Sequence, residues 1–489
     1  MKRLAYTILL LLLVINATAD DSIRIRSCNI GKSMPYGLTR SISQNTTSNH
    51  IGSKRQLVVL AAFADKTFKD ANPLQLWGRI FNEEGFAEDK FIGSVHDYFY
   101  DQSYGKFQLQ FDLHYVKLAN NSARYASTQT DDNNSQYLVY DIVDSLTNRG
   151  GIDWSSYDWD DDGYIDQIII IFAGNGQNSG GGSDTIWPHH SFLTWHKGGH
   201  DVNVSSNGKS YIVSRYCCIN ELDRNKGYGS FGTICHEYSH CFNLPDFYYN
   251  NQSIIRDWDL MDYGNFNGNG FIPCNYSAFE RMLLGWIDIQ ELSEPTEINN
   301  MPALADEPQA YLVRNNAYSN EFYILENRQK KGWDANLPNS GLIIFHIDYD
   351  ESIWKNLVEI ISTTSYKRYY IIPANNNSDL KELSGWSYPY EANDSLTDAS
   401  KPAATLLYKN INGAYLMSKP ITNIHTENGL AGFTFMGGTP TGISNTSQQS
   451  LQPEAIFDLY GRKLNAGEVK SGLYIIKYKN GESRKVFVN

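Results

Sequence analysis

Two histidines and a glutamate share one short segment, His236-Glu237-x-x-His240. No residue in 232–242 breaks a helix, so histidines four residues apart place both imidazoles on one helical face. Two neutral imidazoles suit Zn²⁺, and a catalytic zinc site also needs a third protein ligand and a water. Glu237 stands where it can take a proton from that water. The segment predicts zinc-dependent hydrolysis; the alternative is a histidine pair that serves only helix packing.

Asp246 is the candidate third ligand. It lies six residues after His240, and Pro245 should end the helix before it. Asn243 stands where the chain must turn back, and Asn tolerates the left-handed conformation better than any residue except Gly. The turn would bring the Asp246 carboxylate to the metal. Two alternatives stay open: Asp246 only orients a ligating histidine, or the rival Glu280 supplies the third ligand.

Met261 and Tyr263 follow within the segment 258–264, Trp-Asp-Leu-Met-Asp-Tyr-Gly. A methionine turn below a zinc site gives the ligands an apolar floor, and a tyrosine two residues later can direct its phenol at the metal or at an oxyanion. The alternative is a core methionine beside a surface tyrosine.

The order of these residues resembles the metzincin clan of metalloproteases. With Asp246 as third ligand, preceded by Leu-Pro and followed by Leu-Gly-Trp at 284–286, it is similar to the immune inhibitor A family within that clan. The likeness covers roughly residues 55–435, and it includes the segments 94–99, 103–105, 186–189 and 326–329. One departure is Asn243, because the family usually has Gly there.

The resemblance implies a metzincin-like fold and a secreted zinc endopeptidase acting on proteins or peptides. It implies that Glu237 is the general base. The chemistry of such a site then predicts that Tyr263 helps to stabilise the oxyanion. The implied zinc ligands are His236, His240 and Asp246.

A second cation site is predicted from an acidic segment that fits the first nine positions of an EF-hand-like loop. Gly163 takes the sharp turn, but position 12 is Ile169, where a bidentate Glu would normally stand. We therefore expect a remodelled calcium loop leading into a strand at 168–172, with a solvated acidic turn as the alternative. The candidate calcium ligands are Asp158, Asp160, Asp162 and Asp166.

Both ends of the chain predict export. Residues 1–19 have a basic start, an apolar run at 8–15 and small residues at 17–19, as in a signal peptide. No later segment approaches the ~20 apolar residues of a membrane-spanning helix. Residues 446–489 resemble the C-terminal sorting domain of type IX secretion cargo, which implies the type IX machinery as a partner and a secreted or cell-surface location.

Between these ends, the 489-residue chain predicts an α/β (α+β) catalytic domain at 55–294 and a mostly β accessory domain at 295–436. A pro-segment or arm precedes them at 20–54, and a linker follows at 437–445. The net charge of −13 argues against a nucleic-acid partner. Strands are expected near 56–63, 107–111, 168–172, 310–314, 321–326, 341–347 and 369–372, and three more near 455–459, 473–478 and 484–488. Helices are expected near 92–102 and 136–148.

The remaining cysteines and histidines carry no regular metal pattern. Cys28 in the expected pro-segment is favoured as a disulfide or idle thiol over a latency ligand, and Cys235 and Cys241 point to different helix faces. We expect solvated loop histidines in a cluster, one of which could line a substrate cleft: His189, His190, His196 and His200.

Two other function classes compete with the protease. One is an inactive, calcium-stabilised binding or adhesion protein on a protease fold, and the other is a glycosidase using paired carboxylates. The intact base Glu237 favours the enzyme, because a binding protein does not need it.

Overall fold

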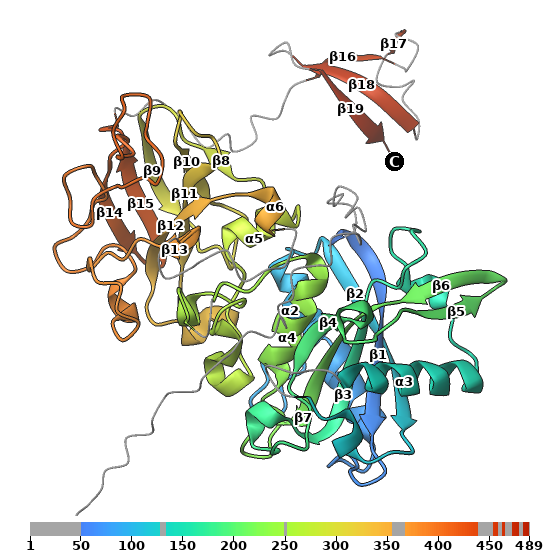
Figure 1. Ribbon diagram of the computed structural model, residues 1–489. Helices are drawn as coiled ribbons and strands as arrows, with labels where there is room; N and C mark the ends of the chain where they lie inside the picture. The colour runs from blue at the N-terminus through green and yellow to red at the C-terminus, as the bar shows by residue number, and fades with distance from the viewer. Residues whose placement is uncertain are drawn as a thin grey trace, which may run out of the picture.

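The computed structural model describes residues 50–127, 134–248, 252–354 and 367–438, together with 453–457, 462–464, 472–478 and 483–488 of the C-terminal part. Three units follow one another along the chain (Figure 1). The predicted signal peptide, most of the predicted arm and most of the predicted linker lie outside the described residues.

The first unit is built on a five-stranded sheet with the strand order β2-β1-β3-β7-β4. The first four strands are parallel, and β4 pairs antiparallel with β7 at one edge. Continuous apolar runs in β1 and β3 are buried on both faces, as parallel strands require. The strands are β1 (Gly52–Ala62), β2 (Phe107–Lys117), β3 (Ile168–Asn175), β4 (His189–Phe192) and β7 (Arg215–Leu222).

Helices cover both faces of this sheet, which confirms the predicted α/β pattern of the first unit. Val58 and Leu60 of β1 share a core with α1 (Pro73–Asn82), α2 (Val95–Gln102) and α4 (Phe231–Ser239). Leu57 and Val59 face the opposite side, where α3 (Ser135–Arg149) packs (Figure 1). A two-stranded hairpin, β5 (Val202–Ser206) with β6 (Lys209–Val213), extends beside α3.

The start of the first unit lies before the predicted boundary at residue 55. His50 is buried, its ring packs edge-on against Phe107 and Phe242, and its carbonyl accepts a hydrogen bond from Trp286 Nε1 at 2.9 Å. Strand β1 begins at Gly52 and pairs with β2 from that residue onward. The last residues of the predicted arm are therefore part of the first unit.

The second unit consists mainly of two sheets, in agreement with the predicted β-rich character. One has the order β13-β12-β11-β10-β8 and the other β14-β15-β9. All four strands predicted between 310 and 372 are present. Two short helices, α5 (Ala278–Leu283) and α6 (Glu351–Trp354), lie near the five-stranded sheet of this second unit (Figure 1). The strands are β8 (Gln290–Glu291), β9 (Thr296–Met301), β10 (Tyr311–Arg314), β11 (Glu321–Arg328), β12 (Gly341–Asp348), β13 (Tyr369–Ile371), β14 (Ile421–Glu427) and β15 (Leu430–Phe435).

A buried polar cluster joins the first two units. The Arg328 guanidinium on β11 donates to both carboxylate oxygens of Asp334 at 2.7 Å, to Glu326 at 3.0 Å and to the Asn275 carbonyl at 3.1 Å. Arg328 is fully buried, and its charge is compensated by these two carboxylates. The cluster fixes the chain near residue 275 against the second unit.

The third unit is a four-stranded antiparallel sheet with the order β17-β16-β18-β19. Three of its strands were predicted from the sequence. They are β16 (Pro453–Phe457), β18 (Gly472–Tyr478) and β19 (Ser483–Val488), joined by β17 (Lys463–Leu464). Within the described parts of the chain, no helix is both long and apolar enough to cross a membrane.

Candidate metal centre

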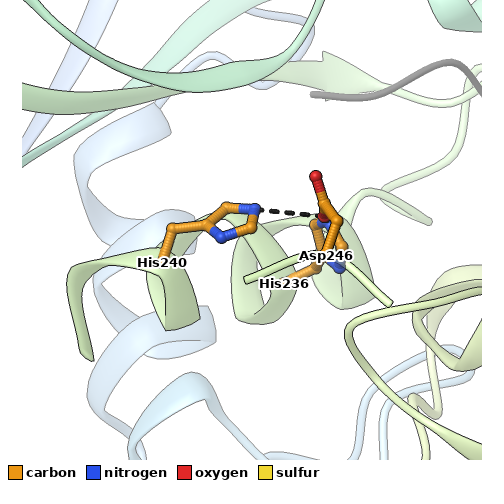
Figure 2. A group of neighbouring side chains, drawn as sticks. All are labelled: His236, His240 and Asp246. Carbon is orange, nitrogen blue, oxygen red and sulfur yellow. Dashed lines mark ion pairs between the residues drawn. The ribbon is translucent and has the colours of Figure 1, made fainter. Parts of the chain in front are cut away.

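Three predicted ligands come together at the end of α4. His236 lies in the last turns of this helix, His240 opens the 3₁₀ turn His240–Phe242 that continues it, and Asp246 approaches after the turn (Figure 2). One ligand atom from each residue lies within 4.8 Å of the other two. The Asp246 Oδ1 atom is 3.2 Å from His236 Nε2 and 3.4 Å from His240 Nε2.

Hydrogen bonds on the far side of each ring determine which nitrogen faces the group. His236 Nδ1 is 2.8 Å from the Leu260 carbonyl, and His240 Nδ1 is 2.7 Å from the Leu244 carbonyl. A carbonyl only accepts, so each Nδ1 carries the proton and each Nε2 keeps a lone pair directed at the centre. This is the arrangement that fixes metal-ligating histidines.

The distances from Asp246 to the two histidines fit a tetrahedral zinc ion. Two atoms that are each about 2.0–2.2 Å from a tetrahedral ion lie roughly 3.3 Å apart. The two nitrogen–oxygen distances at Asp246 match that spacing. Two imidazoles and one carboxylate also leave a coordination position for water, as in catalytic sites.

A left-handed turn brings Asp246 to the histidines. Asn243 has φ 61° and ψ 28°, and it ends the 3₁₀ turn two residues before Pro245. Arg215 on β7 fixes this turn, because its guanidinium donates to the Cys241 carbonyl at 2.9 Å and to Asn243 Oδ1 at 3.1 Å. The sequence indicated the turn but not its arginine partner, whose contact joins segments distant in the chain.

The rival ligand Glu280 lies elsewhere in the hydrogen-bond network. It is fully buried, and its carboxylate accepts from the Ser277 backbone N–H at 2.7 Å and from the Ser277 hydroxyl at 3.0 Å, forming a capping box at the start of α5. Among the described residues, the carboxylate that groups with His236 and His240 is that of Asp246 and not that of Glu280.

Electrostatics in the group favour a bound cation. Burial disfavours a charged Asp246, but the two neighbouring imidazoles outweigh it and hold the pKa of this carboxyl well below its usual range. Burial likewise disfavours a charged His236, but Asp246 and Glu237 together raise its pKa to about 9. The carboxylates of Asp246 and Glu237 therefore favour a positive charge in this buried site. A bound metal ion would supply that charge while the histidines stay neutral.

Glu237 and Met261, the candidate base and the candidate methionine of the turn, are both buried. Glu237 is 3% exposed, next to His236 in the helix. Met261 is fully buried, and its carbonyl accepts from the Phe247 backbone N–H at 2.9 Å, while the preceding carbonyl holds His236. The methionine turn therefore supports both the helix and the segment that follows Asp246.

The methionine turn is anchored to the second unit. Asp259 Oδ1 accepts from the Met261 backbone N–H at 2.8 Å, and Asp259 Oδ2 accepts from the Tyr369 hydroxyl of β13 at 2.9 Å. Tyr263 is only half-buried; its ring contacts Phe266 and lies 5.6 Å from the Arg256 guanidinium. These residues line a pocket of about 410 Å³, so Tyr263 faces a cavity at the edge of the methionine turn.

The prediction of solvated loop histidines is wrong for three of the four. His189 and His190 lie on the edge strand β4 and are fully buried, and His196 is 4% exposed; His200 alone is exposed. His189 Nε2 and His196 Nε2 each lie 2.9 Å from the Tyr216 hydroxyl. Local spacing could not reveal this, because antiparallel pairing with β7 buries the segment.

The acidic segment forms a smaller group than the four carboxylates predicted. Asp158, Asp160 and Asp166 bring one oxygen each within 4.8 Å of one another. Asp162 is not in that group; its carboxylate accepts from the Tyr164 backbone N–H at 2.8 Å. Asp158 accepts from the backbone N–H groups of Asp162 at 3.1 Å and Gly163 at 2.9 Å.

The five described cysteines are buried free thiols. This confirms that Cys235 and Cys241 do not pair with each other. Cys28 lies outside the described residues.

The helix α4 presents two histidines and a glutamate, and a tight turn brings an aspartate back to them. This arrangement is the one expected of a metal-dependent hydrolase. Residues 52–286 match the family described as immune inhibitor A peptidase M6, catalytic domain. That segment contains the first unit and the whole candidate metal centre. The match supports a metalloprotease catalytic domain in this part of the chain.

Two curated relatives agree with this match. The chain is 25% identical over 251 residues to the pre-pro-metalloprotease PrtV of Vibrio cholerae, covering 44% of this chain and 27% of the relative. It is 26% identical over 312 residues to immune inhibitor A of Bacillus thuringiensis, covering 52% and 44%. The chain therefore spans less than half the length of the curated relatives it matches.

Proposed function

We propose that this protein is a secreted zinc-dependent metalloendopeptidase that hydrolyses peptide bonds in proteins. The observation that carries the proposal is the buried group His236, His240 and Asp246, with Glu237 beside it on the same helix. Its donor set, its spacing and its orientation all suit Zn²⁺. The match of residues 52–286 to a metallopeptidase family supports the same chemistry.

The roles of the protein groups follow from their positions. His236, His240 and Asp246 would hold the zinc ion, and their carbonyl partners keep both imidazoles in the ligating tautomer. When bound, zinc acidifies a water and polarises the scissile carbonyl. Glu237 accepts the proton of the attacking water and returns it to the leaving amine. Tyr263 is assigned to the oxyanion through its phenol.

Zinc analysis combined with hydrolysis of fluorescein-labelled casein tests this function. We expect about one zinc per chain after gel filtration, and activity that a chelator removes and added zinc restores. The Glu237→Gln variant should keep its zinc and lose activity. A zinc-loaded wild-type protein that leaves casein and other proteins intact contradicts the proposal, and would point to the inactive binding protein instead.

Two further assignments belong to the same proposal. The group Asp158, Asp160 and Asp166 is a candidate calcium site that supports stability. The C-terminal β unit is assigned to type IX secretion on its resemblance to cargo sorting domains, and residues 1–19 to a signal peptide. Deletion of residues 446–489 tests the sorting role. We expect this deletion to abolish export, and a point variant in the same segment, as the control, to be exported normally.

A further inference from the structure

His190 lies beside the candidate metal centre without being one of its ligands. Its cross-strand partner is Cys217 of β7, and this face of the sheet packs against α4. The His190 ring centroid is 5.4 Å from that of His240, with the rings tilted by 42°. His190 is not part of the group whose ligand atoms lie within 4.8 Å, so it sits one layer outside the ligands.

Both ring nitrogens of His190 are buried and have no hydrogen-bond partner among the residues that the structure describes. The adjacent His189 is equally buried, but its Nδ1 meets the Trp187 carbonyl at 2.6 Å and its Nε2 meets the Tyr216 hydroxyl. Buried side-chain nitrogens without partners are rare in native proteins. This contrast between two neighbouring residues of one strand indicates that the ring nitrogens of His190 form their hydrogen bonds with a bound molecule.

The His190 ring is held in place by its neighbours. It packs edge-on against Phe192, with 5.4 Å between centroids, and the Arg215 guanidinium lies 4.6 Å from the centroid of the Phe192 ring. Arg215 is itself fixed by the turn after His240. An imidazole held this way keeps its polar atoms in position before any ligand binds, which is the requirement for electrostatic preorganisation.

We propose that His190 is a catalytic residue whose ring N–H donates a hydrogen bond to the carbonyl oxygen of the scissile peptide bond. The inference rests on the proposed metalloendopeptidase function. An imidazole carries at least one N–H donor in either protonation state. The His190 ring centroid is 5.4 Å from that of His240, which puts its N–H close to the position that an oxygen held by the metal group would take. Donation strengthens as negative charge develops on that oxygen.

This assignment gives the oxyanion two donors on different elements. Tyr263, expected in this role from its place two residues after Met261, is half-buried at the edge of a cavity and contacts Phe266 and Arg256. His190 comes from the edge strand and is fully enclosed. Removing either donor should therefore leave partial activity, and removing both should cost more than either alone.

The decisive variant is His190→Phe, which keeps the ring and removes both nitrogens. We expect unchanged zinc content and unchanged melting temperature, a kcat about 100- to 1,000-fold lower on labelled casein, and a KM within a few-fold of wild type. His190→Asn and His190→Gln restore an amide donor near one ring nitrogen or the other, and one of them should recover part of kcat. His200→Phe, which replaces the exposed histidine, is the matched control and should leave kcat unchanged.

A binding measurement complements the kinetics. Acetohydroxamate, a small probe whose oxygens enter the same site, should bind zinc-loaded His190→Phe at least several-fold more weakly than wild type by calorimetry. Wild-type kcat in His190→Phe overturns the inference and leaves the proposed function standing. Lost zinc in that variant also overturns it, because His190 would then be a ligand. Absence of casein hydrolysis by zinc-loaded wild type refutes the proposed function and the inference with it.

Discussion

The zinc-type group and the acidic loop both gather three candidate ligands, but they are prepared for a cation in different ways. His236, His240 and Asp246 are 3% exposed or less, and the two histidines are oriented by the carbonyls of Leu260 and Leu244. In the acidic loop, Asp160 is exposed, and the carboxylate of Asp158 already accepts two backbone N–H groups of its own turn.

The difference indicates different dependence on the ion. In the buried group the fold itself supplies the geometry, through the turn at Asn243, its arginine partner and the methionine turn. In the acidic loop, burial is the largest cause that raises the pKa of Asp158, and the neighbouring carboxylates of Asp162 and Asp160 add to it. We therefore expect ion binding to determine chemistry in the first site and stability in the second.

The largest expected effect is on turnover in Glu237→Gln. The amide keeps the shape of the side chain but cannot accept the proton, so kcat should fall by about 10²–10⁴ or more. Zinc content measured by mass spectrometry should stay at the wild-type level. Full activity in this variant would show that Glu237 is not the base, and the claim that ion binding in the buried group determines chemistry would then lose its support.

The second effect concerns which carboxylate holds the metal. Asp246→Ala should weaken zinc affinity by more than about 100-fold, because even indirect partners of a ligand cost 10- to 100-fold. Glu280→Gln is the matched control: burial, then the charge of Asp259, holds the pKa of Glu280 well above its usual range, so the amide resembles the group already present. Zinc loss in Glu280→Gln with retention in Asp246→Ala would assign the site to the rival carboxylate.

Much of the buried site could be predicted because its signals are local. Histidine spacing fixes a helical face, Asn and Pro mark the turn, and apolar runs mark the parallel strands β1 and β3. The capping box at Ser94 explains why the helix expected from residue 92 begins at Val95. Each of these features depends on residues within a few positions of one another.

The features that sequence reasoning missed depend on pairing between distant segments. Strand β4 has only four residues, and its burial follows from pairing with β7. Neither His190 nor Arg215 stands in a recognisable motif, since their contacts join β4, β7 and the turn after α4. Asp162 was assigned to the cation by its position in a loop pattern, but the carboxylates that lie within 4.8 Å of one another are those of Asp158, Asp160 and Asp166.

The third effect is on stability and calcium. A cation that binds only the folded state adds about 2.7 kcal/mol at a hundredfold excess over its dissociation constant. For a unit of this size that corresponds to a melting temperature about 5–10 °C higher. Asp160→Ala should abolish this calcium-dependent shift and keep zinc, whereas Asp162→Ala should lower the melting temperature slightly and keep the shift. Equal calcium shifts in wild type and Asp160→Ala would leave the loop as a solvated turn.

The smallest effect tests whether the buried group is positioned by its turn. Asn243 holds a left-handed conformation that Gly adopts freely, that Asn tolerates through its short polar side chain, and that costs Ala and most other residues about 1–2 kcal/mol. Asn243→Gly loses only the contact with Arg215, so zinc content and kcat should stay within a few-fold of wild type. Asn243→Ala adds backbone strain and should lower the free energy of unfolding by about that amount.

Zinc affinity in the same pair of variants separates a strained turn from a displaced ligand. If the turn places Asp246, Asn243→Ala should bind zinc more weakly than Asn243→Gly when both are titrated against a competing chelator, because the strained chain relaxes by moving the carboxylate away from the histidines. Equal zinc affinity in the two variants would show that Asp246 is held by other contacts. The methionine turn is then the remaining support, since the Met261 carbonyl binds the chain one residue after Asp246.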